Sequence, residues 1–177
     1  MTPAKELTRD DIMDMAAYGA IRMERRREIV ADKKNRRVHI GPHATFYFEN
    51  YWTMWLQVHE MLYIEKGGEA QIPDELNAYN PLIPKGRELI ATVMFEIDDP
   101  AKRAAILGEL GGVEETFFLS IDGAEVTATA ETDVDRTSAE GKASSVQFVH
   151  FHLTDDQAAK LKGCLLYTSD AADDDRG

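Results

Sequence analysis

The sequence predicts an α+β fold with a mainly antiparallel sheet, and three observations lead to it. Residues 49–66 form a segment that is apolar on nearly every side at helical spacing, which indicates a buried helix. Short segments of alternating hydrophobicity, separated by turn residues, predict strands. These strands mix irregularly with helices. We therefore expect an N-terminal helix, a short β-hairpin and a buried central helix packed with a sheet of about four further strands.

Length and composition point to one domain. The chain has 177 residues, of which 44% are hydrophobic, and a formal net charge of -12. It has no apolar run of about 18 residues and no signal-peptide pattern at its start, so we expect neither a membrane span nor export. The expected location is the cytoplasm. The single cysteine, Cys164, lies in the tail considered next, which leaves no thiol for a disulfide, an iron–sulfur cluster or a thiolate zinc site before it.

The last residues, 164–177, differ in character from the rest of the chain. They read CLLYTSDAADDDRG, and the first ten resemble the translation of a transposase-end adapter used in sequencing libraries. We therefore expect residues 164–177 to be a disordered, non-native tail. The natural part is then a single α+β domain at residues 1–163, truncated at its C-terminal end.

The first half is expected to hold a helix, a hairpin and the central helix, at residues 8–35, 37–40 with 44–49, and 49–66. Thr8 is the expected N-cap of the first helix, with a break near Gly19. The sequence Gly-Pro-His predicts the hairpin turn between the two strands. Two glycines end the central helix, and a helical turn at residues 72–76 precedes a loop with two prolines.

The second half is expected to hold, in order, a strand, a short helix, a hairpin, a strand and a final helix, at residues 88–97, after Asp99, at 115–121 with 125–131, at 144–153, and after Thr154. Asp99 followed by a proline predicts an N-cap. Asp-Gly at 122–123 is typical of a tight hairpin turn. Thr154 and Gln157 match a capping box.

A polar stripe interrupts the apolar central helix. Its members fall within about 80° of one another around the helix axis: Asn50, Thr53, Gln57 and Glu60. A buried polar stripe must find partners inside the protein. Two interpretations stay open: a hydrogen-bond network in which Glu60 receives an arginine of the first helix, or a ligand-binding site that also includes Glu49.

Residues 22–37 form the one basic block of an otherwise acidic chain. Its candidate anion-binding or partner-binding residues are Arg25, Arg26, Lys33, Lys34 and Arg36. The alternative, which we favour, is a solvated helix face whose cations pair with neighbouring acids. Nucleic acid is not an expected partner, because the domain is acidic and no stacking aromatics are interleaved with the basic residues.

Five histidines raise the question of a metal. His150 and His152 lie two apart on an expected strand and so share a face. No HExxH, Glu-x-x-His or paired carboxylate motif accompanies them, and we expect separate histidines and assign no metal site. Nucleotide-binding glycine motifs and the GxSxG elbow are also missing from the sequence, so no cofactor is assigned.

Most of the chain, from residue 8 to about residue 162, resembles an uncharacterised bacterial family, domain of unknown function family 3501. The basic block, the motifs FEN and AYNPLIP, and the spacing T-x-x-x-Q-x-x-E-M-L carry this resemblance. Matching positions are Arg26, Lys33, Lys34, Arg36, Glu49, Asn50, Thr53, Gln57, Glu60, Asn80 and Pro81. His59, His150 and His152 are not family positions. Members of the family continue past the last helix into a segment with histidine and tyrosine.

The resemblance also implies a setting, because genes of this family tend to lie beside a rubrerythrin and an iron–sulfur oxidoreductase. The first hypothesis is a non-catalytic partner-binding or ligand-binding accessory of a redox or oxidative-stress system, with one of these proteins as its partner. The second is a metal-dependent redox enzyme that uses carboxylates of the central helix, Glu49 and Glu60. The sequence predicts no oligomeric state and decides neither hypothesis.

Overall fold

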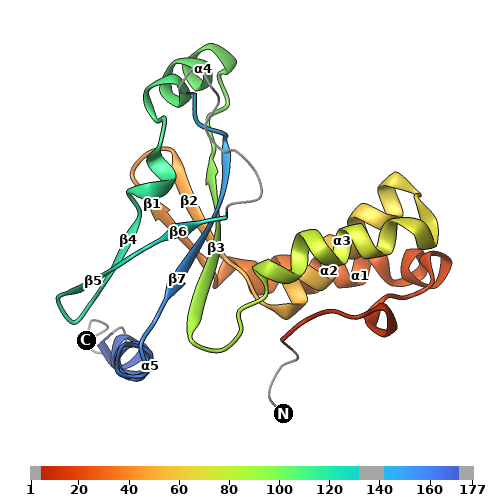
Figure 1. Ribbon diagram of the computed structural model, residues 1–177, viewed down its shortest axis with the longest axis horizontal. Helices are drawn as coiled ribbons and strands as arrows, with labels where there is room; N and C mark the ends of the chain where they lie inside the picture. The colour runs from red at the N-terminus through yellow and green to blue at the C-terminus, as the bar shows by residue number, and fades with distance from the viewer. Residues whose placement is uncertain (1–4, 132–141, 172–177) are drawn as a thin grey trace.

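The computed structural model describes residues 5–131 and 142–171, with side chains to residue 163. This part of the chain forms an α+β fold with a five-stranded sheet in the order β1-β2-β3-β7-β6 and a separate two-stranded sheet, β4-β5 (Figure 1). Every strand pair is antiparallel. The predicted fold class is confirmed, although five strands rather than about four follow the first hairpin.

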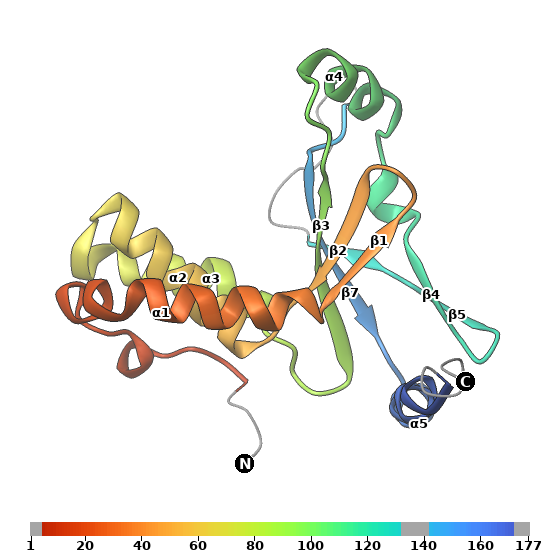
Figure 2. The same ribbon diagram turned by 180° about the vertical axis from the view of Figure 1, so that it is seen from behind.

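Three helices form an arm that extends to one side of the sheet in both views (Figures 1 and 2). They are α1 (Met15–Lys34), α2 (Tyr51–Glu65) and α3 (Ile72–Tyr79). The central helix α2 contacts both α1 and α3. Their shared core includes Tyr18, Val58 and Leu62, and Ile83 and Ile90 continue it to the sheet. Burial of these side chains supplies the main stabilisation of the arm.

The large sheet is built around β3. Its strands are β1 (Arg37–Ile40), β2 (Ala44–Phe48), β3 (Glu88–Phe95), β6 (Thr129–Ala130) and β7 (Val146–His152). One face is apolar, with Ala91, Val93, Val149 and Phe151 packed under the hairpin of β4 (Phe118–Ile121) and β5 (Ala124–Thr127). The alternate residues of β3 and β7 point to the other face, where Ile90 and Phe148 pack into the core of the helical arm and polar side chains such as Glu88 lie beside them.

The predicted caps of two helices and one predicted hairpin turn are confirmed. Asp122 and Gly123 both have positive φ, 51° and 77°, as a type I′ hairpin turn requires. Asp99 caps α4 (Pro100–Glu109) by accepting a hydrogen bond from the Lys102 N–H. Thr154 and Gln157 form the expected capping box at the start of α5 (Asp155–Ala171).

The N-terminal prediction is wrong in two details. Thr8 caps a short 3-10 helix, Arg9–Asp11, and Asp14 caps α1. Helix α1 also runs through Gly19 without a break. A Cβ at Gly19 would come within 3.1 Å of the Tyr63 ring, so this glycine allows α1 and α2 to approach closely.

Three other boundaries differ from the prediction. The expected strand at 125–131 is divided, because the chain leaves β4 after Ala128 and pairs as β6 with β7. The helical turn at 72–76 is the longer helix α3. Helix α2 is buried on most sides, yet Trp52 is 54% exposed and Ile64 is 62% exposed, so one side reaches the surface.

Helix α5 reaches Ala171, but its side chains from Cys164 onward and residues 172–177 lie outside the described part of the chain. The non-native, disordered tail therefore stays a prediction. None of the described helices combines the length and the apolar character that crossing a bilayer needs.

The N-terminus of α2 gives a first test. Asn50 accepts a hydrogen bond from the Thr53 N–H at 2.8 Å and donates through Nδ2 to Asp32 at 3.2 Å. Asn50→Ala removes both, and we expect urea unfolding to show a loss of about 1 to 2 kcal/mol. Asn50→Ser keeps the cap and should recover most of this loss. Wild-type stability for Asn50→Ala would contradict the capping role.

Candidate functional site

The polar stripe of α2 is satisfied by three different parts of the protein. At its start, Asn50 and Thr53 cap the helix, each accepting a hydrogen bond from the other's backbone N–H. In the middle, Gln57 Nε2 donates to the Tyr79 hydroxyl of α3 at 3.3 Å. Further along, Glu60 faces α1. The stripe thus joins the central helix to both of its neighbours.

Glu60 is the most strongly bound residue of the stripe. Its carboxylate receives Nε and Nη2 of Arg22, each at 2.8 Å, and the Tyr18 hydroxyl at 2.6 Å. Arg26 lies 3.6 Å from the same carboxylate. The Glu60 side chain is only 15% exposed. A bidentate contact of this kind is among the stronger hydrogen-bonded ion pairs in proteins. It matches the expectation that an arginine of the first helix pairs with Glu60.

This contact shifts the pKa values of Glu60 in α2 and Tyr18 in α1. The hydrogen bonds from Arg22 lower the pKa of Glu60, so its carboxylate is ionised at neutral pH. Burial, followed by the hydrogen bond to Glu60, raises the pKa of Tyr18. The Arg22 guanidinium also lies 4.7 Å from the centre of the Tyr63 ring. Glu60 is therefore held as a structural anion between the helices.

Glu49 occupies a different place. It lies after β2, is buried, and accepts a hydrogen bond from the Thr92 hydroxyl at 2.7 Å through Oε1. Its Oε2 is buried without a hydrogen-bond partner among the described residues. Glu60 lies nine positions after Tyr51 along α2, a rise of about 14 Å. Glu49 and Glu60 thus do not face a common ligand, which removes the geometric basis for a joint carboxylate site.

His59 is fully buried in the helical core. Its Nδ1–H donates to the Trp55 carbonyl at 2.7 Å, and its Nε2 accepts the Met13 N–H at 3.1 Å. These two partners fix the neutral tautomer, and burial lowers the pKa of the ring. His59 is a structural residue.

The basic block covers α1 from Arg22 to its end at Lys34 and continues through Arg36 to the first residue of β1, and its cations divide into two groups. Arg25 pairs with Glu28 at 2.8 Å and Arg36 with Asp32 at 2.9 Å, so these arginines are locally neutralised. Arg26 and Lys34 belong instead to a stripe that we call the outward face of α1. Its members line a shallow hollow: Met23, Arg26, Arg27, Val30, Ala31 and Lys34. Lys33 is partly buried beside it.

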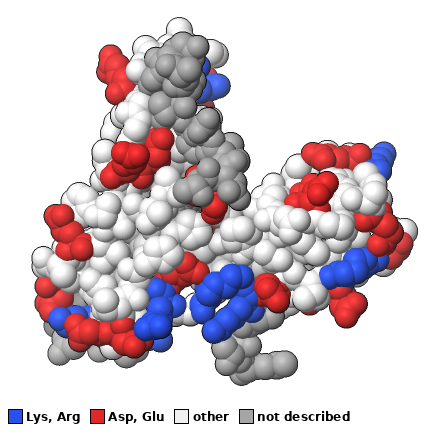
Figure 3. Space-filling model, in the orientation of Figure 1, with Lys and Arg blue, Asp and Glu red and all other residues white. Residues whose placement is uncertain are grey.

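On one face of the molecule, charge is dispersed. On the side of the molecule shown in Figure 3, Lys and Arg form small separate groups among acidic residues and uncharged surface. This view is opposite to that of Figure 2, where α1 lies nearest the viewer. The expectation that nucleic acid is not a partner stays a prediction.

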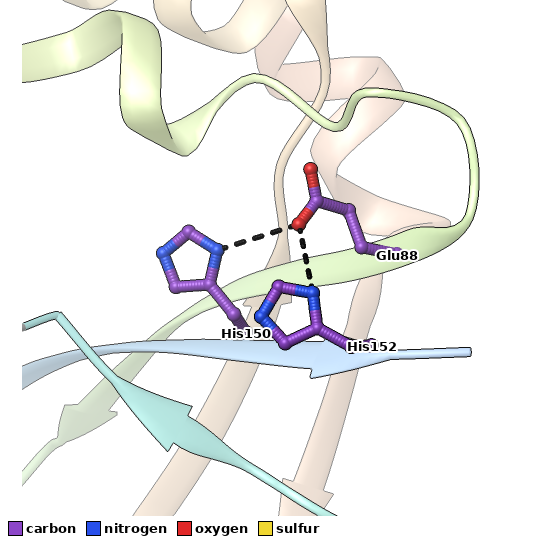
Figure 4. A group of neighbouring side chains, drawn as sticks. All are labelled: Glu88, His150 and His152. Carbon is purple, nitrogen blue, oxygen red and sulfur yellow. Dashed lines mark ion pairs between the residues drawn. The ribbon is translucent and has the colours of Figure 1, made fainter. Parts of the chain in front are cut away.

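The remaining histidines are not all separate. His150 and His152 of β7 lie side by side and both face Glu88 of β3 (Figure 4). His150 also contacts Glu131 at 2.9 Å. In contrast, His39 contacts the Thr45 hydroxyl at the other edge of the sheet. The sequence showed the shared face of His150 and His152, but not the acids that strand pairing adds to it.

Together, the fold and its polar contacts define an α+β protein in which a three-helix arm is tied by an internal ion pair and stands beside an antiparallel sheet. The chain belongs to the family described as "Protein of unknown function (DUF3501)", which matches residues 6–166. Comparison with curated proteins gives no match.

One solved structure is similar over most of the chain. It is the crystal structure of a novel protein of unknown function from Burkholderia pseudomallei, with a TM-score of 0.81 and 41% sequence identity. The match covers 89% of this chain and 82% of that chain. At this identity, the fold of the two proteins is shared.

The ion pair between Glu60 and Arg22 gives a second test, which measures how stability depends on pH. The pKa of Glu60 in the folded protein lies below its unfolded value of 4.5. Its contribution to stability is therefore complete above pH 4.5 and is lost as the pH falls through the lowered pKa. We expect Glu60→Gln to cost about 1 to 2 kcal/mol at pH 7 in urea unfolding.

The same variant should depend less on pH than the wild type below pH 4.5, because it lacks this titrating group. An equal loss of stability in both proteins on acidification would contradict a specific role for Glu60.

Proposed function

We propose that this protein is a cytoplasmic, non-catalytic accessory of a redox system and that it binds an acidic protein partner through the outward face of α1. The composition of the outward face of α1 supports this proposal. Met23 is 64% exposed and Val30 is 55% exposed, and three cations surround them. These residues recur at helical spacing along one side of α1.

Arg26 lies 3.6 Å from Glu60, whereas the described residues show no ion pair for Arg27 or Lys34. Exposed apolar side chains beside such cations are a typical composition for a binding surface. The apolar side chains gain free energy when a partner covers them. The cations favour approach of an acidic surface and disfavour a basic one. Arg25 and Arg36, whose charges are neutralised by Glu28 and Asp32, contribute less to such selection.

The other side of α1 is held in place. Tyr18 is fully buried and Ile29 nearly so, and Arg22 joins Glu60 of α2. The outward face is thus presented on a fixed helix, so little conformational entropy is lost when a partner binds.

The stripe on α2 offers less for a ligand. Gln57, Glu60 and the cap residues already have partners inside the protein. These hydrogen bonds support a structural role for the stripe. They favour the hypothesis of partner binding on α1 over that of ligand binding on α2. The separation of Glu49 from Glu60 likewise gives no support to the alternative of a metal-dependent enzyme built on these two carboxylates.

The proposed partner is an iron–sulfur oxidoreductase or a rubrerythrin, as the family resemblance implies. The test is the affinity of the purified protein for each of these candidates, encoded beside a family member, measured by biolayer interferometry. Arg27→Glu with Lys34→Glu should weaken binding by about tenfold or more, because both reversals place anions on the docking face. The effect should be larger at low salt.

The matched control reverses two exposed lysines elsewhere, Lys102→Glu on α4 and Lys162→Glu on α5, and should leave binding unchanged. Circular dichroism checks that both variants fold. Unchanged affinity of the Arg27/Lys34 variant, or equal weakening in the control, would exclude the outward face as the docking surface.

A further inference from the structure

We propose that Glu88, His150 and His152 form a binding site for a divalent transition-metal ion of the zinc or iron(II) class. The inference is independent of the partner surface on α1. The three residues lie on one face of the large sheet, on the neighbouring strands β3 and β7 (Figure 4).

Strand pairing fixes the three side chains relative to one another. Glu88 of β3 is directly opposite His152 of β7, and His150 is two residues away on the same face. The two imidazole rings are stacked, with centroids 5.9 Å apart and an angle of 16° between their planes. A site on paired strands is held more rigidly than one on loops.

The distances fit metal ligands better than hydrogen bonds. Glu88 Oε2 lies 3.6 Å from His150 Nδ1 and 3.5 Å from His152 Nδ1. Both distances exceed the usual 2.7 to 3.2 Å of an N–H···O hydrogen bond. Ligands about 2.1 Å from a tetrahedral ion are about 3.4 Å apart. One potential ligand atom from each of the three residues lies within 4.8 Å of the other two, so a small ion can reach all of them.

Two further contacts orient the ligands. His150 Nε2 lies 2.9 Å from Glu131 Oε2, a contact in which the Nε2–H donates and Nδ1 is left free to face Glu88. A carboxylate behind a histidine ligand is a common arrangement in metal sites. On the other side, Glu88 Oε1 accepts the Lys85 N–H at 2.8 Å, which directs Oε2 toward the histidines.

The donor set indicates the class of ion. Two imidazole nitrogens and one carboxylate suit zinc and iron(II), whereas calcium and magnesium prefer oxygen ligands alone. Glu88 and His150 are largely buried, at 11% and 13% side-chain exposure, but His152 is 64% exposed. Three protein ligands and an open side leave a fourth position for water or a small ligand.

The alternative is a metal-free ion pair in which a protonated His150 bridges Glu88 and Glu131. The two arrangements differ in one respect. A metal site needs His152, whereas the His150 bridge does not. Zinc also binds surface histidines nonspecifically, so the test must compare His152 with another histidine of this chain.

The experiment is isothermal titration of the full, untagged chain with ZnCl2, together with Co2+ absorption spectra. We expect one equivalent of zinc, and cobalt bands typical of tetrahedral coordination. His152→Ala should weaken binding by about 100-fold or more, and Glu131→Gln by about 10 to 100-fold. His43→Ala should bind as the wild type does. Iron(II), added without oxygen, should compete with zinc.

His152 is exposed, so His152→Ala should fold normally, which circular dichroism can verify. If zinc does not bind at one equivalent, or if His152→Ala binds as tightly as the wild type, the metal site is excluded. Equal losses in His43→Ala and His152→Ala would show nonspecific binding and overturn the proposal as well.

Discussion

The ion pair between Glu60 and Arg22, closed by the Tyr18 hydroxyl, fixes how α1 docks on α2 within the helical arm. Helix α1 has twenty residues, yet only Tyr18 and Ile29 are buried. Such a helix gains little from apolar burial and needs specific contacts to hold its position. Glu60 supplies them at the middle of α2, opposite the start of α1. These contacts lie on the inner side of α1, and Met23 and Val30 on its outer side are exposed.

The large sheet separates two environments in a similar way. Its apolar face packs under the β4-β5 hairpin, and its other face carries the acids and histidines of β3 and β7. Alternation along paired strands is what brings Glu88, His150 and His152 together. The proposed partner surface and the proposed metal site thus lie on different parts of the same small domain, the first on α1 and the second on β3 and β7.

Much of the fold follows from local rules that act within a few residues. The Asp-Gly turn, the caps at Asp99 and Thr154, and the apolar periodicity of α2 were predictable for this reason. Glu60 was expected to meet an arginine because a buried anion requires a cation. Glu88 and Glu131 were not foreseen as partners of His150, because strand register depends on pairing between distant segments. The close approach of Gly19 to Tyr63 of α2 likewise joins distant segments, so the local sequence does not reveal why α1 holds a glycine there.

Glu60 joins α1 to α2 through contacts that we expect to act together. The most direct measurement is a double-mutant cycle of Tyr18→Phe and Glu60→Gln, with the free energy of unfolding obtained from urea titrations at pH 7. Tyr18 is fully buried and its hydroxyl lies 2.6 Å from Glu60. If the two contacts act together, we expect a coupling energy of about 1 kcal/mol or more between Tyr18 and Glu60. Additive effects, within about 0.3 kcal/mol, would contradict it.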